Sequence, residues 1–196
     1  KAIELWRTAL PQGNKEHIAK ILFSYENPPG TKEIAGSQDA IGIVYPGLNK
    51  LDYHGAYWPE TIASARDEDS LAWLERRLHL VPLAPRGPDF NVLAETHVSL
   101  DGARALAVAA EACWRSILAR DTAAFGRACT ASFDAQVAMF PRMANQGIID
   151  VIQAHRGRAA GWKLSGAGGG GYVILVSESP VPDAIQIRIR RPYALF

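Results

Sequence analysis

Apolar residues recur at helical spacing near the start of the chain. Residues 16–25 place four apolar side chains on one face of a helix: Ile18, Ile21, Leu22 and Tyr25. Asn14 stands before this run as an N-cap residue does, and the Asn-Pro-Pro-Gly run at 27–30 ends it. We expect an earlier helix to stop at the Pro-Gln-Gly-Asn run of residues 11–14.

Two short β-rich runs follow, at residues 41–45 and 48–53, with Pro46-Gly47 between them. Turn residues between two such runs predict a β-hairpin. Gln38 and Asp39 would then lie on the loop at the mouth of the hairpin.

The later part of the chain mixes helical and strand-like patterns. Residues 101–155 are helical almost throughout, with breaks near Arg120-Asp121 and at Pro141. A short helix capped by Asp69 is predicted before the first of three later strands, at 78–83, 172–176 and 184–189. Helices and strands mixed in this way, with hairpin-type strand connections, predict an α+β fold.

Composition and charge favour small-molecule chemistry. The 21 basic and 20 acidic residues nearly cancel, and the nearest thing to a basic patch is Arg188, Arg190 and Arg191. No run approaches the roughly 20 apolar residues that a membrane span needs. The first ten residues lack the apolar core of a signal peptide. We therefore expect a cytoplasmic protein that binds neither nucleic acid nor membranes.

The two cysteines, Cys113 and Cys129, each fall inside a helical run, and neither lies near a His at metal-ligand spacing. Both are expected to be reduced core residues. The five histidines show no metal-binding spacing.

A glycine run at residues 166–171 is the one low-complexity feature. It formally contains Gly-x-Gly-x-x-Gly, but dinucleotide binding needs a strand before the glycines and a helix after them. The opposite order is predicted, with a helix before the run and the 172–176 strand after it. Five glycines in six residues exceed what one turn requires. We expect a loop whose backbone lies against a ligand or against other backbone.

The segment Lys163-Leu164-Ser165-Gly166-Ala167-Gly168-Gly169-Gly170-Gly171-Tyr172 resembles the third motif of the GHMP kinases, a family that includes galactokinases and mevalonate kinases. In that family the segment is a glycine loop that lines the active site beside the nucleotide phosphates. Exposed N–H groups of such a loop suit phosphate oxygens. The resemblance implies that ATP is bound and that five residues line its site: Gly166, Ala167, Gly168, Gly169 and Gly170.

A second element, Gly36-Ser37-Gln38-Asp39, resembles one found in family members of the fucokinase and heptose-phosphate-kinase type. The resemblance implies that Asp39 is the catalytic residue, which orients and deprotonates the sugar hydroxyl, and that Gln38 lies at the substrate. A carboxylate suits this role because phosphoryl transfer demands mostly positioning and charge stabilisation. The structural alternative is an Asp that caps its own loop through a backbone hydrogen bond.

Glu26 and Arg86 complete the implied site. Glu26 ends a helix, as a Glu does in the relatives, where it is implied to hold Mg²⁺, a cation that prefers hard oxygen ligands. A solvated carboxylate at a helix end is the alternative. Arg86 follows the predicted strand at 78–83 and either contacts a substrate phosphate or is a solvated loop residue. Ala40 stands where relatives often have Gln, which leaves the identity of the sugar open.

No segment resembles the nucleotide-phosphate loop of the family, a Pro-x-x-x-Gly-Leu-x-Ser-Ser type sequence. The chain has no initiator Met and its first helix has no cap, so we expect a fragment. Residues 1–60 would be a remnant of the amino-terminal kinase domain, and residues 61–196 the ferredoxin-like carboxy-terminal domain.

The expected function is that of part of a kinase acting on a sugar or sugar phosphate, inactive by itself and prone to self-association. A non-catalytic interaction or oligomerisation module is the alternative. The kinase interpretation requires Asp39 and the glycine run to meet at one cleft.

Overall fold

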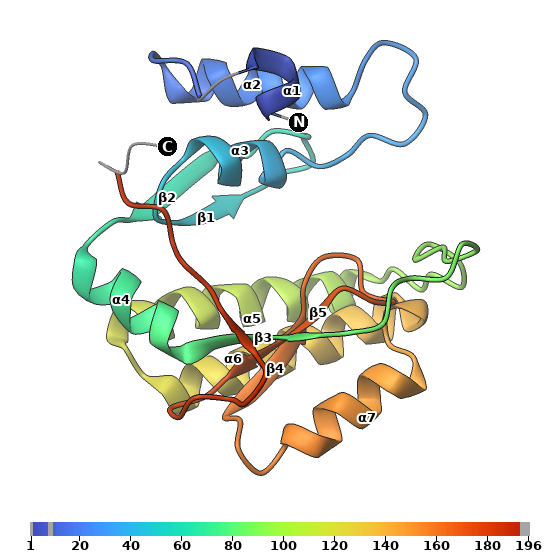
Figure 1. The fold of residues 1–196 in the computed structure, drawn as a ribbon. Coiled ribbons are helices and arrows are strands. Elements are labelled where there is room, and N and C mark those ends of the chain that lie inside the picture. Colours follow the sequence, from blue (N-terminus) through green and yellow to red (C-terminus); the bar gives the residue numbers. More distant parts are fainter. Residues whose placement is uncertain (1, 8–9, 193–196) are drawn as a thin grey trace. The chain divides into compact units, whose positions relative to one another are not determined.

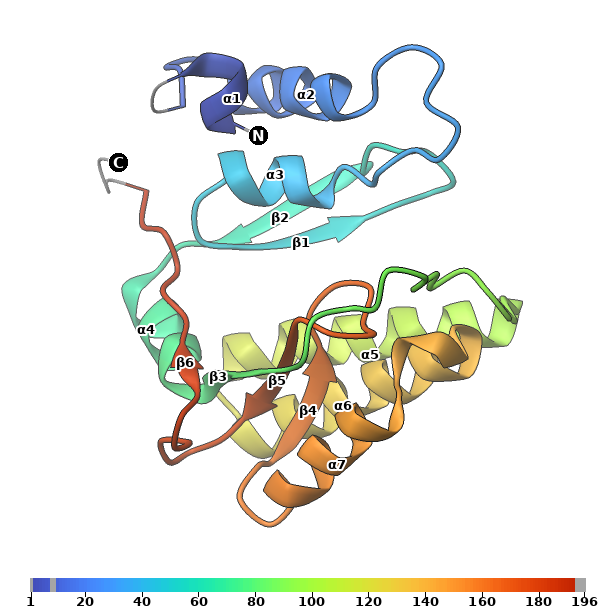
Figure 2. The same cartoon turned by 45° about the vertical axis from the view of Figure 1, so that its right-hand side comes forward.

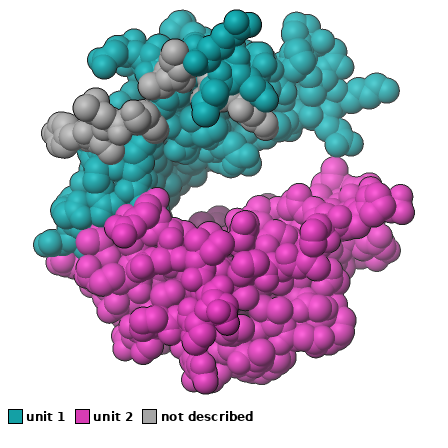
Figure 3. Space-filling model, in the orientation of Figure 1, with its two compact units in different colours: residues 1–71, 189–196 teal, residues 72–188 magenta. Residues whose placement is uncertain are grey.

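The computed structural model describes residues 2–7 and 10–192, which divide into two compact units (Figure 3). Unit 1 comprises residues 1–71 and 189–196, and unit 2 comprises residues 72–188. Residue 190 joins unit 1 through a backbone hydrogen bond, since Gly47 N–H donates to the Arg190 carbonyl at 2.9 Å. Arg191 adds a two-bond ion pair with Glu68, with both N···O distances at 2.7 Å.

Unit 1 combines helices with a two-stranded antiparallel sheet (Figure 1). Its elements, in chain order, are α1 (Ala2–Trp6), α2 (Lys15–Glu26), α3 (Gln38–Val44), β1 (Leu48–Asp52), β2 (Thr61–Ala65) and the start of α4 (Glu68–Arg77). The predicted cap of α2 is confirmed, because Asn14 Oδ1 accepts a hydrogen bond from His17 N–H at 3.0 Å. The predicted helix before residue 11 is also present, as α1.

The predicted strand at residues 41–45 is wrong, because this segment belongs to the helix α3. Ala40, Ile41 and Val44 are buried at helical spacing, and the last two pack with Ile18 and Ala19 of α2. Burial of this face outweighs the β preference of Ile and Val. Gln38 and Asp39 therefore lie in the first turn of a helix and not on a hairpin loop.

The hairpin of unit 1 is formed by β1 and β2, and not by the predicted strands at 41–45 and 48–53. Strand β1 pairs antiparallel with β2, in a register that runs from Leu48 opposite Ala65 to Asp52 opposite Thr61. The aromatic loop of residues 53–60 is therefore the hairpin connection. Pro46-Gly47 instead joins α3 to β1.

Unit 2 packs helices against a four-stranded antiparallel sheet (Figure 2). Its elements are the remainder of α4, β3 (Leu78–Pro82), α5 (Leu100–Ala119), α6 (Thr122–Met139), the 3₁₀ helix η1 (Pro141–Met143), α7 (Gln146–His155), β4 (Gly161–Leu164), β5 (Tyr172–Val176) and β6 (Ile185–Gln186). The strand order is β4-β5-β3-β6, and every neighbouring pair is antiparallel. The predicted α+β class is confirmed. None of the helices described in either unit is long and apolar enough to cross a membrane.

One cluster of buried side chains forms the main core of unit 2. Val173 and Leu175 of β5 have no exposed surface, and they pack with Leu164 of β4. Helices α6 and α7 cover this face of the sheet through Phe133 and Ile148, among others. The two inward residues of β5 alternate along the strand, as the sequence pattern of a sheet requires.

Most of the predicted elements of unit 2 are confirmed, with three differences. The predicted strand at 184–189 pairs only over Ile185–Gln186. Asp67, not Asp69, caps α4, because Asp67 Oδ1 accepts from Ser70 N–H at 2.9 Å. A strand, β4, precedes the glycine run where a helix was predicted, so the run joins two antiparallel strands.

Helix α6 and strand β4 approach closely at two glycines. A Cβ added to Gly161 would lie 2.6 Å from the Cα of Gly126. Side-chain atoms at this crossing would force the helix away from the sheet, so the contact depends on the missing Cβ atoms.

We predict that Gly161→Ala destabilises unit 2 by about 3 kcal/mol, because the added methyl group overlaps the backbone of α6. Thermal unfolding followed by circular dichroism measures the loss. Gly157→Ala is the matched control, because a Cβ at position 157 meets nothing within 4 Å. A Gly161→Ala protein as stable as this control would contradict the close contact.

Candidate functional site

The glycine loop, residues 165–171, connects β4 to β5 in unit 2. Four of its glycines have positive φ angles: Gly166 at 69°, Gly168 at 72°, Gly169 at 70° and Gly171 at 84°. Residues with a Cβ rarely adopt this region, so the backbone path itself requires glycine at these positions. Because no helix follows the glycines, the exclusion of a dinucleotide-binding turn is supported.

Three hydrogen bonds hold the loop against its surroundings in unit 2. Gly169 N–H donates to the Met143 carbonyl at 2.8 Å. The Gly168 carbonyl accepts from Arg86 Nε at 2.7 Å, and the Gly171 carbonyl accepts from Leu83 N–H at 2.9 Å. The loop is thus fixed at several points along its length.

Close backbone approach explains the excess of glycine further. A Cβ at Gly170 would lie 2.7 Å from the Ala84 carbonyl oxygen and 2.9 Å from the Arg86 nitrogen. A Cβ at Gly168 would lie 2.9 Å from the Met143 Cα. Within unit 2, the run is therefore shaped by contact with other backbone as well as by positive φ angles.

Several N–H groups of the loop keep their hydrogen-bonding capacity. The N–H groups of Gly166, Ala167 and Gly170 donate to no acceptor among residues 2–7 and 10–192. Successive backbone N–H groups in a turn with positive φ angles form a concavity that suits anions. These N–H groups can donate hydrogen bonds to phosphate oxygens, whereas the Gly169 N–H already donates to the Met143 carbonyl.

Arg86, a predicted substrate residue, lies beside the glycine loop. Its Nε donates to the loop, and its guanidinium carbon lies 5.5 Å from the centre of the Phe90 ring. The residue as a whole is exposed. Arg86 therefore holds the loop through Nε, and its terminal nitrogens remain available to an anion.

Asp39 and Gln38 lie in unit 1, both exposed, in the first turn of α3. The Asp39 carboxylate makes no hydrogen bond or ion pair with another residue in the described part of the chain. The structural alternative, an Asp that caps its own loop, is therefore not what this side chain does here. A carboxylate at this end of a helix is favoured by the positive end of the helix dipole.

Two sets of hydrogen bonds position the start of α3, and the sequence analysis identified neither. The Asn27 side chain accepts from Ala35 N–H at 2.8 Å and donates to the Ala35 carbonyl at 3.2 Å. Ser37 is fully buried, and its Oγ donates to the Tyr57 carbonyl at 2.6 Å and lies 3.0 Å from the Tyr53 hydroxyl. The backbone around Gln38 and Asp39 is therefore tied both to the end of α2 and to the hairpin loop.

Glu26, the predicted magnesium ligand, is the last residue of α2 and is half-buried. No group of three or more His, Cys, Asp or Glu side chains that could hold a metal ion occurs among the residues described. Any metal bound at Glu26 would have to take further ligands from elsewhere, as Mg²⁺ does when it binds through nucleotide phosphates and water.

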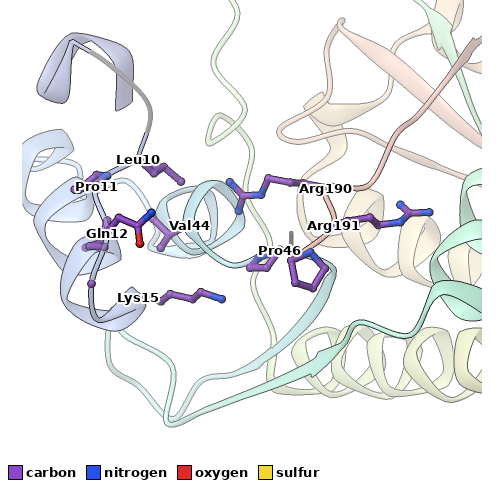
Figure 4. A pocket seen from close by; sticks show the side chains of 11 residues that line it. Leu10, Pro11, Gln12, Lys15, Val44, Pro46, Arg190 and Arg191 are labelled. Atoms are coloured by element: carbon purple, nitrogen blue, oxygen red, sulfur yellow. The ribbon is translucent and has the colours of Figure 1, made fainter. Parts of the chain in front are cut away.

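A cavity of about 210 Å³ in unit 1 lies at the other end of α3, where Val44 and Pro46 line it. Figure 4 shows Arg190 directed toward this cavity and Arg191 directed away from it. Burial lowers the pKa of the Arg190 guanidinium. Since none of the predicted site residues lines it, this cavity is not part of the implied site.

Solved structures of kinases share this fold. A mevalonate kinase from Methanococcus jannaschii matches with a TM-score of 0.61 and 18% identity, over 90% of this chain and 52% of its own. A D-glycero-D-manno-heptose 1-phosphate kinase from Bacteroides thetaiotaomicron matches with a TM-score of 0.57 and 14% identity, over 90% and 48%.

A protein described as a sugar kinase, from Campylobacter jejuni, matches with a TM-score of 0.55 and 17% identity, again over 90% and 48%. The fold is that of the GHMP-type kinases. The chain spans about half the length of these GHMP-type structures. No known family profile matches the sequence, and no curated protein sequence matches it.

We predict that Ser37→Ala loosens the start of α3, because it removes the donor to the Tyr57 carbonyl. A loss of about 1.4 kcal/mol corresponds to about ten-fold faster exchange of the α3 amides. Hydrogen exchange with mass spectrometry measures this rate, and Ser24→Ala, at an exposed position on α2, is the control. Equal exchange in the two variants would show that the buried hydroxyl does not hold α3.

Arg86→Ala is predicted to release the glycine loop, because the variant loses both the bond to Gly168 and the contact with Phe90. The amides of residues 165–171 should exchange at least about ten-fold faster, as expected for the loss of one hydrogen bond from a charged donor, about 1.5 kcal/mol or more. The matched control is Arg104→Ala, since Arg104 is exposed and its Nη1 lies 3.6 Å from Asp101 Oδ1, away from the glycine loop in the sequence. Unchanged exchange of the loop in Arg86→Ala would refute this role.

Proposed function

We propose that this chain is part of an ATP-dependent GHMP-type kinase that phosphorylates a hydroxyl of a sugar or sugar phosphate. The observation that carries the proposal is the fold, which matches sugar and mevalonate kinases over 90% of the chain. These neighbours include kinases of sugars and of mevalonate, so the sugar acceptor is proposed from the resemblance of Gly36-Ser37-Gln38-Asp39 to the fucokinase and heptose-phosphate-kinase element.

In this proposal the glycine loop binds the nucleotide phosphates. The uncommitted N–H groups of Gly166, Ala167 and Gly170 support this role, because they offer donors without the cost of breaking an existing bond. Gly168 and Gly169 supply the backbone path, and the terminal nitrogens of Arg86 add positive charge beside it. Phosphoryl transfer depends mostly on such positioning and charge stabilisation.

Asp39 is proposed as the base that orients and deprotonates the acceptor hydroxyl, with Gln38 as a second hydrogen-bonding partner of the acceptor. The exposed, unengaged carboxylate on a well-anchored helix supports this role, since a base must reach its proton directly. The proposal requires Asp39 and the glycine loop to face one bound pair of substrates.

Magnesium fits Glu26 chemically. Its Oε1 atom is buried at the end of α2, and a carboxylate oxygen is the kind of ligand that Mg²⁺ accepts. Bound Mg²⁺ would neutralise charge on the nucleotide phosphates. Glu26 would contribute one oxygen ligand to it.

The resemblance to GHMP-type kinases also assigns the two parts of the chain to the two domains of such a kinase. The amino-terminal kinase domain, expected at residues 1–60, is assigned to unit 1, and the ferredoxin-like carboxy-terminal domain, expected at residues 61–196, to unit 2, because β2 (Thr61–Ala65) pairs with β1 across the expected boundary. Antiparallel strands covered by paired helices in unit 2 support the second assignment.

The test is a phosphorylation assay on the full-length protein with ATP and Mg²⁺, screened against sugars, sugar phosphates and mevalonate. We expect turnover of a sugar or sugar phosphate, and we predict that Asp39→Asn lowers kcat about 100-fold or more. Asp101→Asn is the control, because Asp101 is also an exposed Asp in the first turn of a helix.

The outcomes separate the kinase from the alternative function. Full activity in Asp39→Asn would remove Asp39 from the chemistry. No turnover of any acceptor, together with no binding of ATP, would favour a non-catalytic interaction module. Residues 1–196 assayed alone provide the matching background, because no segment of the chain resembles a nucleotide-phosphate loop.

A further inference from the structure

The two cysteines of the chain face each other across the pair of helices α5 and α6. Their Sγ atoms lie 4.0 Å apart, and both are free thiols. The helices are joined by Arg120 and Asp121, so Cys113 lies seven residues before the turn and Cys129 eight residues after it. At this spacing the two residues stand at the same level of an antiparallel helix pair.

The surroundings of the two thiols differ. Cys129 is 2% exposed, whereas Cys113 is half-buried and can be reached from solvent. This corrects the expectation that both are core residues. A hydrogen bond from Cys129 and the nearby charge of Lys163 lower the pKa of Cys113, and burial opposes them. The pKa of Cys129 is raised, mainly by the same hydrogen bond and by burial.

Because the two thiols differ in exposure and in pKa, they have different roles in an oxidation reaction. A thiolate is the reactive form of cysteine, and reactivity follows thiolate character and exposure. Cys113 has both more of the thiolate and more exposure, so it is the sulfur that an oxidant meets first. Cys129 is shielded from solvent but lies beside Cys113, so it is placed to react with an oxidised Cys113.

We propose that Cys113 and Cys129 are a thiol oxidation site, which hydrogen peroxide converts to a reversible disulfide between α5 and α6. The sulfurs must close from 4.0 Å to about 2.05 Å for the bond to form.

The reaction balances in two steps. Cys113 first gives up its thiol proton to solvent; the thiolate sulfur then attacks one peroxide oxygen, the O–O bond breaks to leave a sulfenic acid, and the departing hydroxide takes up a proton from solvent to give water. The Cys129 sulfur then attacks the sulfenic sulfur, the S–S bond forms, and the S–O bond breaks. The departing hydroxide takes the Cys129 proton as a second water. The two thiols are oxidised and the peroxide is reduced.

The disulfide would link α6 covalently to α5. Helix α6 packs on β4, the strand that leads into the glycine loop. A disulfide here closes a short stretch of chain and restricts the unfolded state. We expect the oxidised protein to unfold at a higher temperature than the reduced protein.

The test treats the reduced, folded protein with hydrogen peroxide and measures its intact mass. We expect the loss of two hydrogen atoms, restored by dithiothreitol, with no covalent dimer. Trypsin should then release residues 105–115 linked to residues 128–142, since arginines stand at positions 104, 115, 127 and 142. A folded protein that keeps both thiols, or gains oxygen at Cys113 without a cross-link, would overturn the proposal.

Two serine variants separate the two roles. Cys129→Ser should stop at the sulfenic acid of Cys113, which dimedone traps. Cys113→Ser should leave Cys129 as a thiol under the same treatment, because Cys129 is shielded from solvent. If Cys129 in the Cys113→Ser variant were oxidised as fast as Cys113 in the Cys129→Ser variant, the assignment of Cys113 as the reactive thiol would be wrong.

Discussion

The proposed chemistry depends on the hydrogen bonds and close contacts that hold the glycine loop against neighbouring backbone. Met143, Arg86 and Leu83 hold the loop at three points, and a Cβ at Gly168 or Gly170 would collide with backbone atoms. A loop fixed in this way presents its remaining N–H groups without first losing conformational freedom. Preorganised donors of this kind are what a transferring phosphoryl group requires.

The helix that carries Asp39 is also held in place by contacts with the surrounding chain. A surface carboxylate acts as a base only if its backbone is held in place, and α3 is too short to be stable alone. Burial of Ile41 and the hydrogen bonds of Ser37 supply that support from the surrounding chain. Each of the two candidate segments is thus rigid by virtue of contacts made within its own unit.

Local patterns predicted the long helices and the glycine loop, because helical periodicity and glycine content are properties of neighbouring residues. They failed at α3, where Ile41 and Val44 carry β preference but are buried at helical spacing. They also missed Ser37 and Met143, whose roles come from partners distant in the chain. Arg86 was predicted as a substrate residue, which stays a prediction, and its bond to Gly168 spans 82 residues and follows from no local pattern.

The most direct measurement of the central claim is a crystal structure of the full-length protein with Mg²⁺ and a non-hydrolysable ATP analogue. The account predicts phosphate oxygens within hydrogen-bonding distance of the Ala167 and Gly170 N–H groups, with the Asp39 carboxylate facing the terminal phosphate. A nucleotide bound away from the glycine loop, or an Asp39 on a different face of the protein from the terminal phosphate, would contradict it.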